Sequence, residues 1–174
     1  MYLATLENKT KGNQMTLTAF NSDNYATPAG FAADPVILTV HNDVLSVLLV
    51  DSVIRGQKGL PGGFVGETED AEETAKRKLF EKTGVENVYL EQLATYSDPD
   101  RDSRGRIVSN AFLSLVPSSQ LPEDSNAEWF PVDELPSMVF DHEDMVEAAV
   151  NRLKGKLWYS NVAYGLLPEV FSAG

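Results

Sequence analysis

The sequence contains no cysteine. Disulfide bonds, thiolate metal sites and cysteine nucleophiles are therefore excluded as features of this chain. No run of apolar residues approaches the roughly 20 that a membrane-spanning helix needs. From these absences we expect neither a signal peptide nor a membrane span, and we expect a cytoplasmic location.

Basic residues are few. The 174 residues include 14 Lys and Arg against 26 Asp and Glu, which gives a formal net charge of −12. Nucleic-acid binding depends on neutralising phosphates, so this chain by itself is not expected to hold DNA or RNA. It also has no helix-turn-helix pattern and no basic recognition helix. A hydrophobic content of 43% and a charged content of 23% instead indicate one globular domain with a substantial core.

Histidine is also scarce, with two in the chain. His41 lies at the end of a predicted strand, where a satisfied or exposed side chain is expected. His142 lies at the start of a predicted helix and is expected to serve that helix start. Neither histidine is expected to take part in chemistry.

The most informative stretch is residues 60–85, LPGGFVGETEDAEETAKRKLFEKTGV. A Gly-Gly turn leads into an amphipathic helix, and Gly84 ends it. Asp70 and Glu73 have the spacing of a capping box, and acidic residues favour the positive N-terminal end of a helix. Apolar residues recur every fourth position and predict a packing stripe: Ala71, Ala75 and Leu79. Two i,i+4 ion pairs are predicted, Glu72 with Lys76 and Glu73 with Arg77.

Positions 78, 81 and 82 share one arc of this helix and read Lys-Glu-Lys. Three carboxylates there would form a hard-oxygen site for Mg²⁺. The actual residues carry a summed charge of +1 instead of −3, so metal attraction is largely lost while a diphosphate would be attracted. The alternative is that Lys78 and Lys82 form a solvated face that pairs with Glu81.

Alternating and β-branched runs predict the sheet. Residues 35–43 and 44–51 should form a hairpin, and residues 88–96 and 107–116 should form two further strands around a turn-rich tip at 98–106. A short strand at 127–130 and a helix at 141–157 should follow, with Trp129 and Phe130 in the core. Before residue 35 we expect an edge strand at 15–20 and a loop at 21–34, belonging either to a flexible leader or to an arm that packs on a partner subunit.

Other cations and one aromatic residue are candidates for contact with a phosphorylated ligand. Arg55 and Lys58 precede the Gly-Gly turn, where backbone can approach phosphate closely, although both could equally be solvent-exposed loop charges. Phe64 follows the turn as either a ligand wall or a core residue. The tip at 98–106 carries three arginines and three aspartates, which either pair with one another or reach into the pocket or across a dimer. We favour the second reading, for Arg101 and Arg106 more than for Arg104.

The spacing of Gly63, Glu69, Arg77, Leu79, Glu81, Gly84 and Val85 resembles the box of the Nudix family. Members bind, and usually hydrolyse, nucleoside diphosphates linked to another moiety. This chain departs from the pattern at Lys78 and Lys82, where the family has glutamates that help to hold divalent metals. The resemblance implies an α/β fold, a Nudix-type α/β/α sandwich with a mixed β-sheet.

The segments DPVILTV, LPGGFV and LEQLATYSDPDRDSRGRIVSNAF, with the stretch from FDHEDMV to LLPEVF, are similar to Nudix-related transcriptional regulators of NAD metabolism. In that subgroup a Nudix-like domain senses ADP-ribose or a related nucleotide, and a C-terminal winged-helix domain binds operator DNA. The resemblance implies an arm or leader at 1–33, an effector-binding domain at 34–160 and the start of a linker at 161–174 towards a winged helix absent from this chain. It also implies a homodimer.

We therefore expect the effector-sensing domain of a transcriptional regulator of NAD metabolism, which binds ADP-ribose or a related NAD-derived nucleotide without hydrolysing it. It is expected to require no cofactor and to have no catalytic or metal-binding residues. The predicted ligand-binding residues are Arg55, Lys58, Gly62, Gly63, Phe64, Lys78, Glu81, Lys82, Arg101 and Arg106. The alternative is a Nudix hydrolase in which Glu81, with Glu69 or Glu73, holds one metal. A third hypothesis is a protein-interaction module that binds no nucleotide.

Overall fold

A computed structural model of the chain describes residues 30–123 and 125–159, apart from the side chains of 157–159. The edge strand expected at 15–20 and the linker expected at 161–174 lie outside the described residues. Within the described part, no helix is long and apolar enough to span a membrane.

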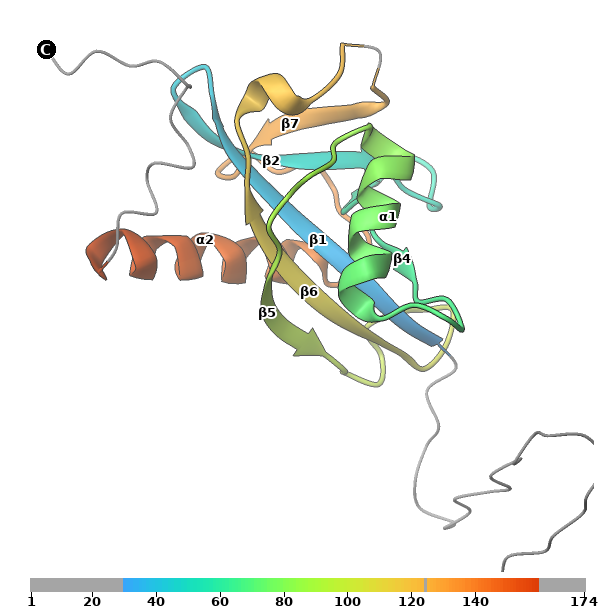
Figure 1. Cartoon of the computed structure of the whole chain (residues 1–174). Coiled ribbons are helices and arrows are strands. Elements are labelled where there is room, and N and C mark those ends of the chain that lie inside the picture. Colours follow the sequence, from blue (N-terminus) through green and yellow to red (C-terminus); the bar gives the residue numbers. More distant parts are fainter. Residues whose placement is uncertain (1–29, 124, 160–174) are drawn as a thin grey trace, which may run out of the picture.

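The described residues form a mixed seven-stranded sheet (Figure 1). The strands are β1 (Gly30–His41), β2 (Val44–Asp51), β3 (Lys58–Gly59), β4 (Gly63–Phe64), β5 (Glu91–Tyr96), β6 (Ile107–Leu115) and β7 (Ala127–Pro131). The main path of the sheet runs β3-β2-β1-β6-β5, while β4 pairs with β1 and β7 pairs with β2. β1 and β6 are parallel, and the other pairs are antiparallel.

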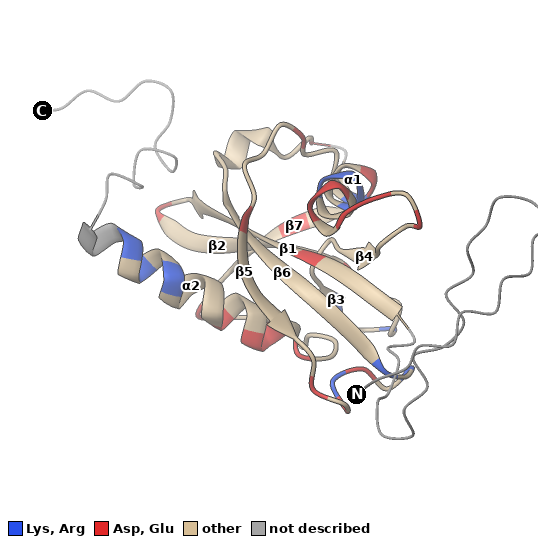
Figure 2. Ribbon diagram, turned by 60° about the horizontal axis from the view of Figure 1, so that its bottom comes forward, with Lys and Arg blue, Asp and Glu red and all other residues tan. Residues whose placement is uncertain are grey.

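Two α-helices cover opposite faces of the sheet: α1 (Ala71–Thr83) and α2 (His142–Tyr159) (Figure 2). A short 3-10 helix, η1 (Ser118–Gln120), follows β6. β1 illustrates the two-sided core, because Ile37 packs with Leu79 of α1 whereas Leu38 packs with Met145 of α2. Such alternation follows from the two-residue period of a strand. The predicted α/β/α sandwich with a mixed sheet is confirmed.

The predicted hairpin is also present, and its turn residues Asn42 and Asp43 both have positive φ, 49° and 64°. These residue types tolerate that region in two-residue hairpin loops. The expected loop at 21–34 is wrong for residues 30–34, which belong to β1. Their parallel pairing with β6 and antiparallel pairing with β4 supply hydrogen bonds that outweigh the weak strand propensity of Gly and Ala.

The box helix forms as its caps predict. Asp70 accepts from the Glu73 N–H at 2.8 Å, and the Glu73 carboxylate accepts from the Asp70 N–H at 3.0 Å, which confirms the capping box. Gly84 ends the helix in the left-handed region, with φ 77°. Ala75 and Leu79 are fully buried, which confirms the packing stripe. Trp129 and Phe130 pack against the core as predicted.

Candidate functional site

A cavity of about 440 Å³ opens at the end of the sheet near the Gly-Gly turn. Its volume falls within the range of roughly 300–1,000 Å³ found for small-molecule sites. Four groups of residues surround it: the strand ends of β1 and β2, the turn and α1, the β5–β6 hairpin tip, and the start of α2. Its polar and aromatic lining includes Asp34, Asp51, Ser52, Phe64, Arg77, Lys78, Lys82, Arg101, Asp102, Arg104, Phe140 and His142.

The Gly62-Gly63 turn requires glycine because the backbone passes directly over β1. A Cβ at Gly62 would overlap the Asp34 side chain and the Ala33 carbonyl, and one at Gly63 would lie 3.0 Å from the Lys78 stem. The turn therefore brings the backbone into close contact with a buried carboxylate on one side and α1 lysines on the other.

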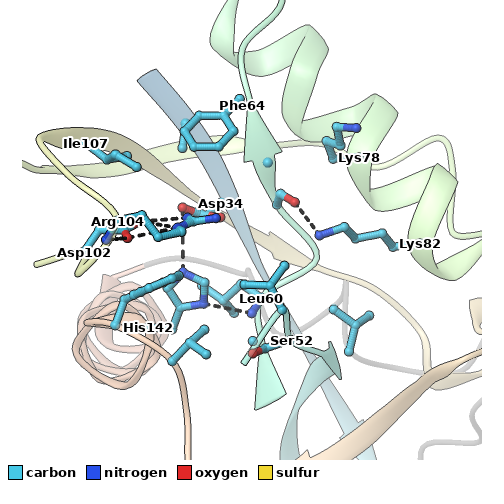
Figure 3. A pocket seen from close by; sticks show the side chains of 18 of the residues that line it. Asp34, Ser52, Leu60, Phe64, Lys78, Lys82, Asp102, Arg104, Ile107 and His142 are labelled. Atoms are coloured by element: carbon cyan, nitrogen blue, oxygen red, sulfur yellow. Dashed lines mark hydrogen bonds and ion pairs between the residues drawn. The ribbon is translucent and has the colours of Figure 1, made fainter. Parts of the chain in front are cut away.

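Lys82 binds the turn directly. Its Nζ donates to the Gly62 carbonyl at 2.6 Å (Figure 3). The residue as a whole is exposed, but its ammonium is withdrawn from water, and this desolvation lowers the pKa of Lys82 despite the nearby charge of Asp34. Lys78 also lines the cavity and pairs with Glu81 at 2.8 Å. Both lysines thus face the cavity, and each also has a partner within the protein.

Arg77 corrects one sequence expectation. Its guanidinium binds Glu69 through two 2.7 Å hydrogen bonds and Glu81 through one of 2.9 Å. The predicted pair with Glu73 is wrong, because that carboxylate is used in the capping box. The Arg77 hydrogen bonds, followed by one from Thr74, lower the pKa of Glu69 to about 2. The predicted Glu72–Lys76 pair is present at 2.6 Å.

These residues do not fit a divalent metal. In the described part of the chain, no group of three or more His, Cys, Asp or Glu side chains converges on one point. Glu69 and Glu81 are engaged by Arg77, and Glu73 caps the helix. The carbonyl of Gly62, an oxygen of the kind that hard cations prefer, already accepts the Lys82 ammonium. A cationic side chain therefore binds the carbonyl oxygen that a hard cation would otherwise contact.

Asp34 is a site residue that the sequence interpretation missed. It is 5% exposed and accepts a 2.5 Å hydrogen bond from the Ser109 hydroxyl. The parallel pairing of β1 with β6 brings the two residues together. No local sequence signal marks this role, because Asp34 is a single acidic residue before an apolar run and is predicted to lie in a loop.

His142 begins α2 as expected, but it also lines the cavity. Its Nδ1 accepts from the Leu60 N–H at 3.0 Å, so the ring proton is on Nε2, which lies 3.9 Å from the Asp34 carboxylate. Burial lowers the pKa of His142 and favours the neutral ring. The histidine thus joins the Gly-Gly turn, β1 and α2.

The hairpin tip contributes two cavity arginines with different surroundings. Arg101 is buried and binds Asp141 through hydrogen bonds of 2.5 and 2.7 Å. Arg104 binds Asp102 and lies over two aromatic rings, with its guanidinium carbon 4.7 Å from the Phe140 centroid and 5.4 Å from that of Phe64. The sequence favours Arg101 and Arg106 over Arg104 as ligand contacts, but the structure places Arg104 in the cavity lining and leaves Arg106 outside it.

Four predicted site residues do not line this cavity in the described structure: Arg55, Lys58, Glu81 and Arg106. Arg55 is exposed on its loop. Lys58 pairs with Asp51 at 2.9 Å. Arg106 donates to the carbonyls of Ser97 and Asp98, which directs its guanidinium to its own hairpin. The cavity does bring together Gly62, Gly63, Phe64, Lys78, Lys82 and Arg101.

The arrangement can hold an anion beside a flat group. Lys78, Lys82 and Arg104 supply positive charge around the glycine turn. Phe64 is 45% exposed and, with Phe140, supplies apolar surface at the same cavity. Phe140 has a positive φ of 52°, a conformation that is rare for a bulky residue and is found preferentially at functional sites.

The chain is similar to several known proteins. The NUDIX domain model matches residues 31–149. The ADPR responsive transcriptional repressor NtrR of Acinetobacter baylyi is 31% identical over 170 residues, which cover 91% of this chain and 68% of the repressor. An ADP-ribose pyrophosphatase of Methanocaldococcus jannaschii is 34% identical over 114 residues, which cover 64% of this chain and 68% of that enzyme.

Two crystal structures of Shewanella oneidensis NrtR are also similar. The structure complexed with a 27mer DNA shares 37% identity and a TM-score of 0.72, covering 80% of this chain and 68% of that chain. The NUDIX domain complexed with ADP ribose shares 34% identity and a TM-score of 0.65, covering 77% of this chain and 94% of that one. The relatives thus include both regulators and an enzyme.

Proposed function

The chain belongs to the NUDIX family, and we propose that it is the effector-sensing domain of a transcriptional regulator of NAD metabolism, binding ADP-ribose without hydrolysing it. One observation supports the proposal that the chain does not hydrolyse its ligand. The Lys82 ammonium binds the Gly62 carbonyl, so a fixed positive charge of the protein occupies a place suited to a metal ion. Among the residues that the structure describes, no cluster of carboxylates could hold a metal that activates water.

The ligand's diphosphate would lie against the Gly62-Gly63 turn, near Lys78, Lys82 and Arg104. Backbone at a glycine turn approaches phosphate closely, and ammonium and guanidinium groups bind it through charge-assisted hydrogen bonds. The adenine or ribose would lie against Phe64 and Phe140. In this arrangement Arg101 shapes the cavity wall, and Arg55, Lys58, Glu81 and Arg106 make no direct contact with the ligand.

The partners follow from the relatives. A repressor and a DNA-bound structure are among them, and this domain carries a net charge of −12. DNA would therefore be bound through a separate winged-helix domain that follows the arm (1–33), the sensor (34–160) and the linker (161–174). We also propose that the sensor is a homodimer and acts in the cytoplasm.

The second candidate function is hydrolysis of ADP-ribose. It is favoured by the ADP-ribose pyrophosphatase among the relatives and by the match to the box outside positions 78 and 82. In that case Mg²⁺ would have to displace the Lys82 ammonium from the Gly62 carbonyl. Glu69 or Glu81 would also have to give up its hydrogen bonds with Arg77.

Incubation with ADP-ribose and excess Mg²⁺ separates the two. Products are analysed by chromatography, with the chain at substrate-level concentration so that even slow turnover is detected. The proposed function predicts intact ADP-ribose in amounts equal to a protein-free control. Conversion to AMP and ribose 5-phosphate in proportion to protein concentration would establish the hydrolase instead.

A further inference from the structure

The β5–β6 hairpin tip connects the cavity to the start of α2. At the cavity side, Arg104 has a half-exposed side chain that is accessible to a ligand. At the other side, the Arg101 side chain is 2% exposed and binds Asp141, the residue just before α2. Both arginines line the cavity, but Arg104 leaves its side chain open to a ligand, whereas Arg101 is anchored at the start of α2, which also borders the cavity.

The carboxylate of Asp102 ties Arg104 to the tip. Its side chain is 1% exposed and accepts from Arg104 Nη2 at 2.7 Å, from Nε at 3.0 Å and from the Arg104 backbone N–H at 2.9 Å. A buried carboxylate that loses its guanidinium partner is strongly unfavourable. If a bound anion draws the guanidinium of Arg104, Asp102 must therefore move with it.

Asp102 directly follows Arg101, so this movement reaches the second ion pair. Both hydrogen bonds from Arg101 go to the carboxylate of Asp141. The backbone carbonyl of Asp141 in turn accepts the Met145 N–H in the first turn of α2. Met145 is fully buried against the sheet, where close packing transmits small displacements.

We propose that two ion pairs, the partly exposed Arg104–Asp102 and the buried Arg101–Asp141, transmit ligand binding from the cavity to the first turn of α2. This ion-pair relay rests on the proposed function, because an anionic nucleotide must reach Arg104. The ligand can shift the equilibrium of α2 only by the difference between its binding free energies for the two arrangements of the tip. The His142 ring, at the start of α2, accepts from the Leu60 N–H just before the Gly-Gly turn and packs edge-on against Phe140.

The test is hydrogen exchange of the whole chain with and without saturating ADP-ribose, after calorimetry has measured binding. The relay predicts that ligand changes the exchange rates of amides in the first two turns of α2 by about fivefold or more, the lower range of allosteric coupling. The Kd of the Asp141→Asn variant for ADP-ribose should stay within about threefold of that of the unaltered chain, which is a difference of less than about 1.4 kcal/mol in binding free energy. The α2 response should be lost, and Asp141→Glu should restore it.

A matched control breaks different ion pairs of α2. Glu91 pairs with Arg152 and with Lys156 towards the other end of the helix, so Glu91→Gln removes these charge interactions without touching the relay. It should leave the α2 response to ligand unchanged. If Asp141→Asn fails to fold by thermal melting, the double variant Arg101→Gln with Asp141→Asn leaves neither charge unpaired. It should show no α2 response at saturating ligand.

The outcomes are separable. Failure of the unaltered chain to bind ADP-ribose would overturn the proposed function and the relay together. Binding with no change in α2, or with the same change in Asp141→Asn, would overturn the relay while leaving the proposed function intact. Loss of the response in Glu91→Gln would also contradict the relay, since α2 would then respond to any loosened contact.

Discussion

Replacing Lys82 with Met removes the ammonium at the glycine turn and keeps most of the aliphatic stem. Two opposite unit charges about 4 Å apart attract by roughly 1 kcal/mol in water and roughly 4 kcal/mol at an effective dielectric constant of about 20. Lys82 lies between these limits, because the residue is exposed while its ammonium is desolvated. We expect a loss of about 2 kcal/mol in ADP-ribose binding, which is about 30-fold in Kd.

The assay is calorimetric titration, with Lys76→Met as the matched control. Lys76 lies on the same helix, is exposed and pairs with Glu72 away from the cavity. Its replacement should change Kd less than about twofold, because distant exposed charges are screened by salt. If Lys82→Met binds as tightly as the unaltered chain, or if Lys76→Met loses as much affinity, the assignment of Lys82 to the ligand is refuted.

The pH dependence of ADP-ribose binding provides a second test of the role of Lys82. Desolvation lowers the pKa of Lys82 from its ordinary value of 10.5. The charged form binds an anion, so affinity should be full below this lowered pKa and fall as pH rises through it. The fall should therefore begin at a lower pH than an ordinary lysine would give. Lys82→Met should lack this component of the pH dependence below pH 10.5.

Three further predictions concern the box and the helices. The double variant Lys78→Glu with Lys82→Glu should acquire Mg²⁺-dependent breakdown of ADP-ribose, measured by product chromatography; binding without breakdown would mean that other catalytic groups are also missing. Since the pKa of Glu69 is lowered to about 2, its contribution to stability should be present above pH 4.5 and lost as pH falls towards 2, and Glu69→Gln should remove that part of the acid dependence in thermal unfolding. Gly62→Ala should lower the free energy of unfolding by about 1–3 kcal/mol or more, because its Cβ would overlap β1. Gly155→Ala, whose Cβ would meet open space in α2, should raise the free energy of unfolding by about 0.5–1 kcal/mol. Urea titrations measure both, and equal effects of the two variants would contradict the steric explanation.

Local signals predicted much of this fold. The capping box at Asp70 and Glu73, the stop at Gly84 and the turn at Asn42-Asp43 are all short-range features, and all three are present. The start of β1 was misjudged because residues 30–34 gain their strand conformation from pairing with β6, which lies far along the chain.

The site was predicted only in part, for the same reason. The glycine turn and the α1 lysines belong to one contiguous motif, so their shared location could be read from spacing. Asp34 and His142 meet only through the tertiary fold and carry no local signature. Among the tip arginines, sequence could not reveal that Arg106 bonds its own hairpin while Arg104 lies between Phe64 and Phe140.

In the proposed function a protein ammonium, and not a metal, completes the nucleotide site. Calorimetric titration of the chain with ADP-ribose in EDTA and again in Mg²⁺, followed by recovery of the ligand, tests this. We predict the same affinity within about twofold in both conditions and recovery of intact ADP-ribose, because Lys82 already binds the Gly62 carbonyl. Binding that requires Mg²⁺, with conversion of the ligand to AMP and ribose 5-phosphate, would contradict it.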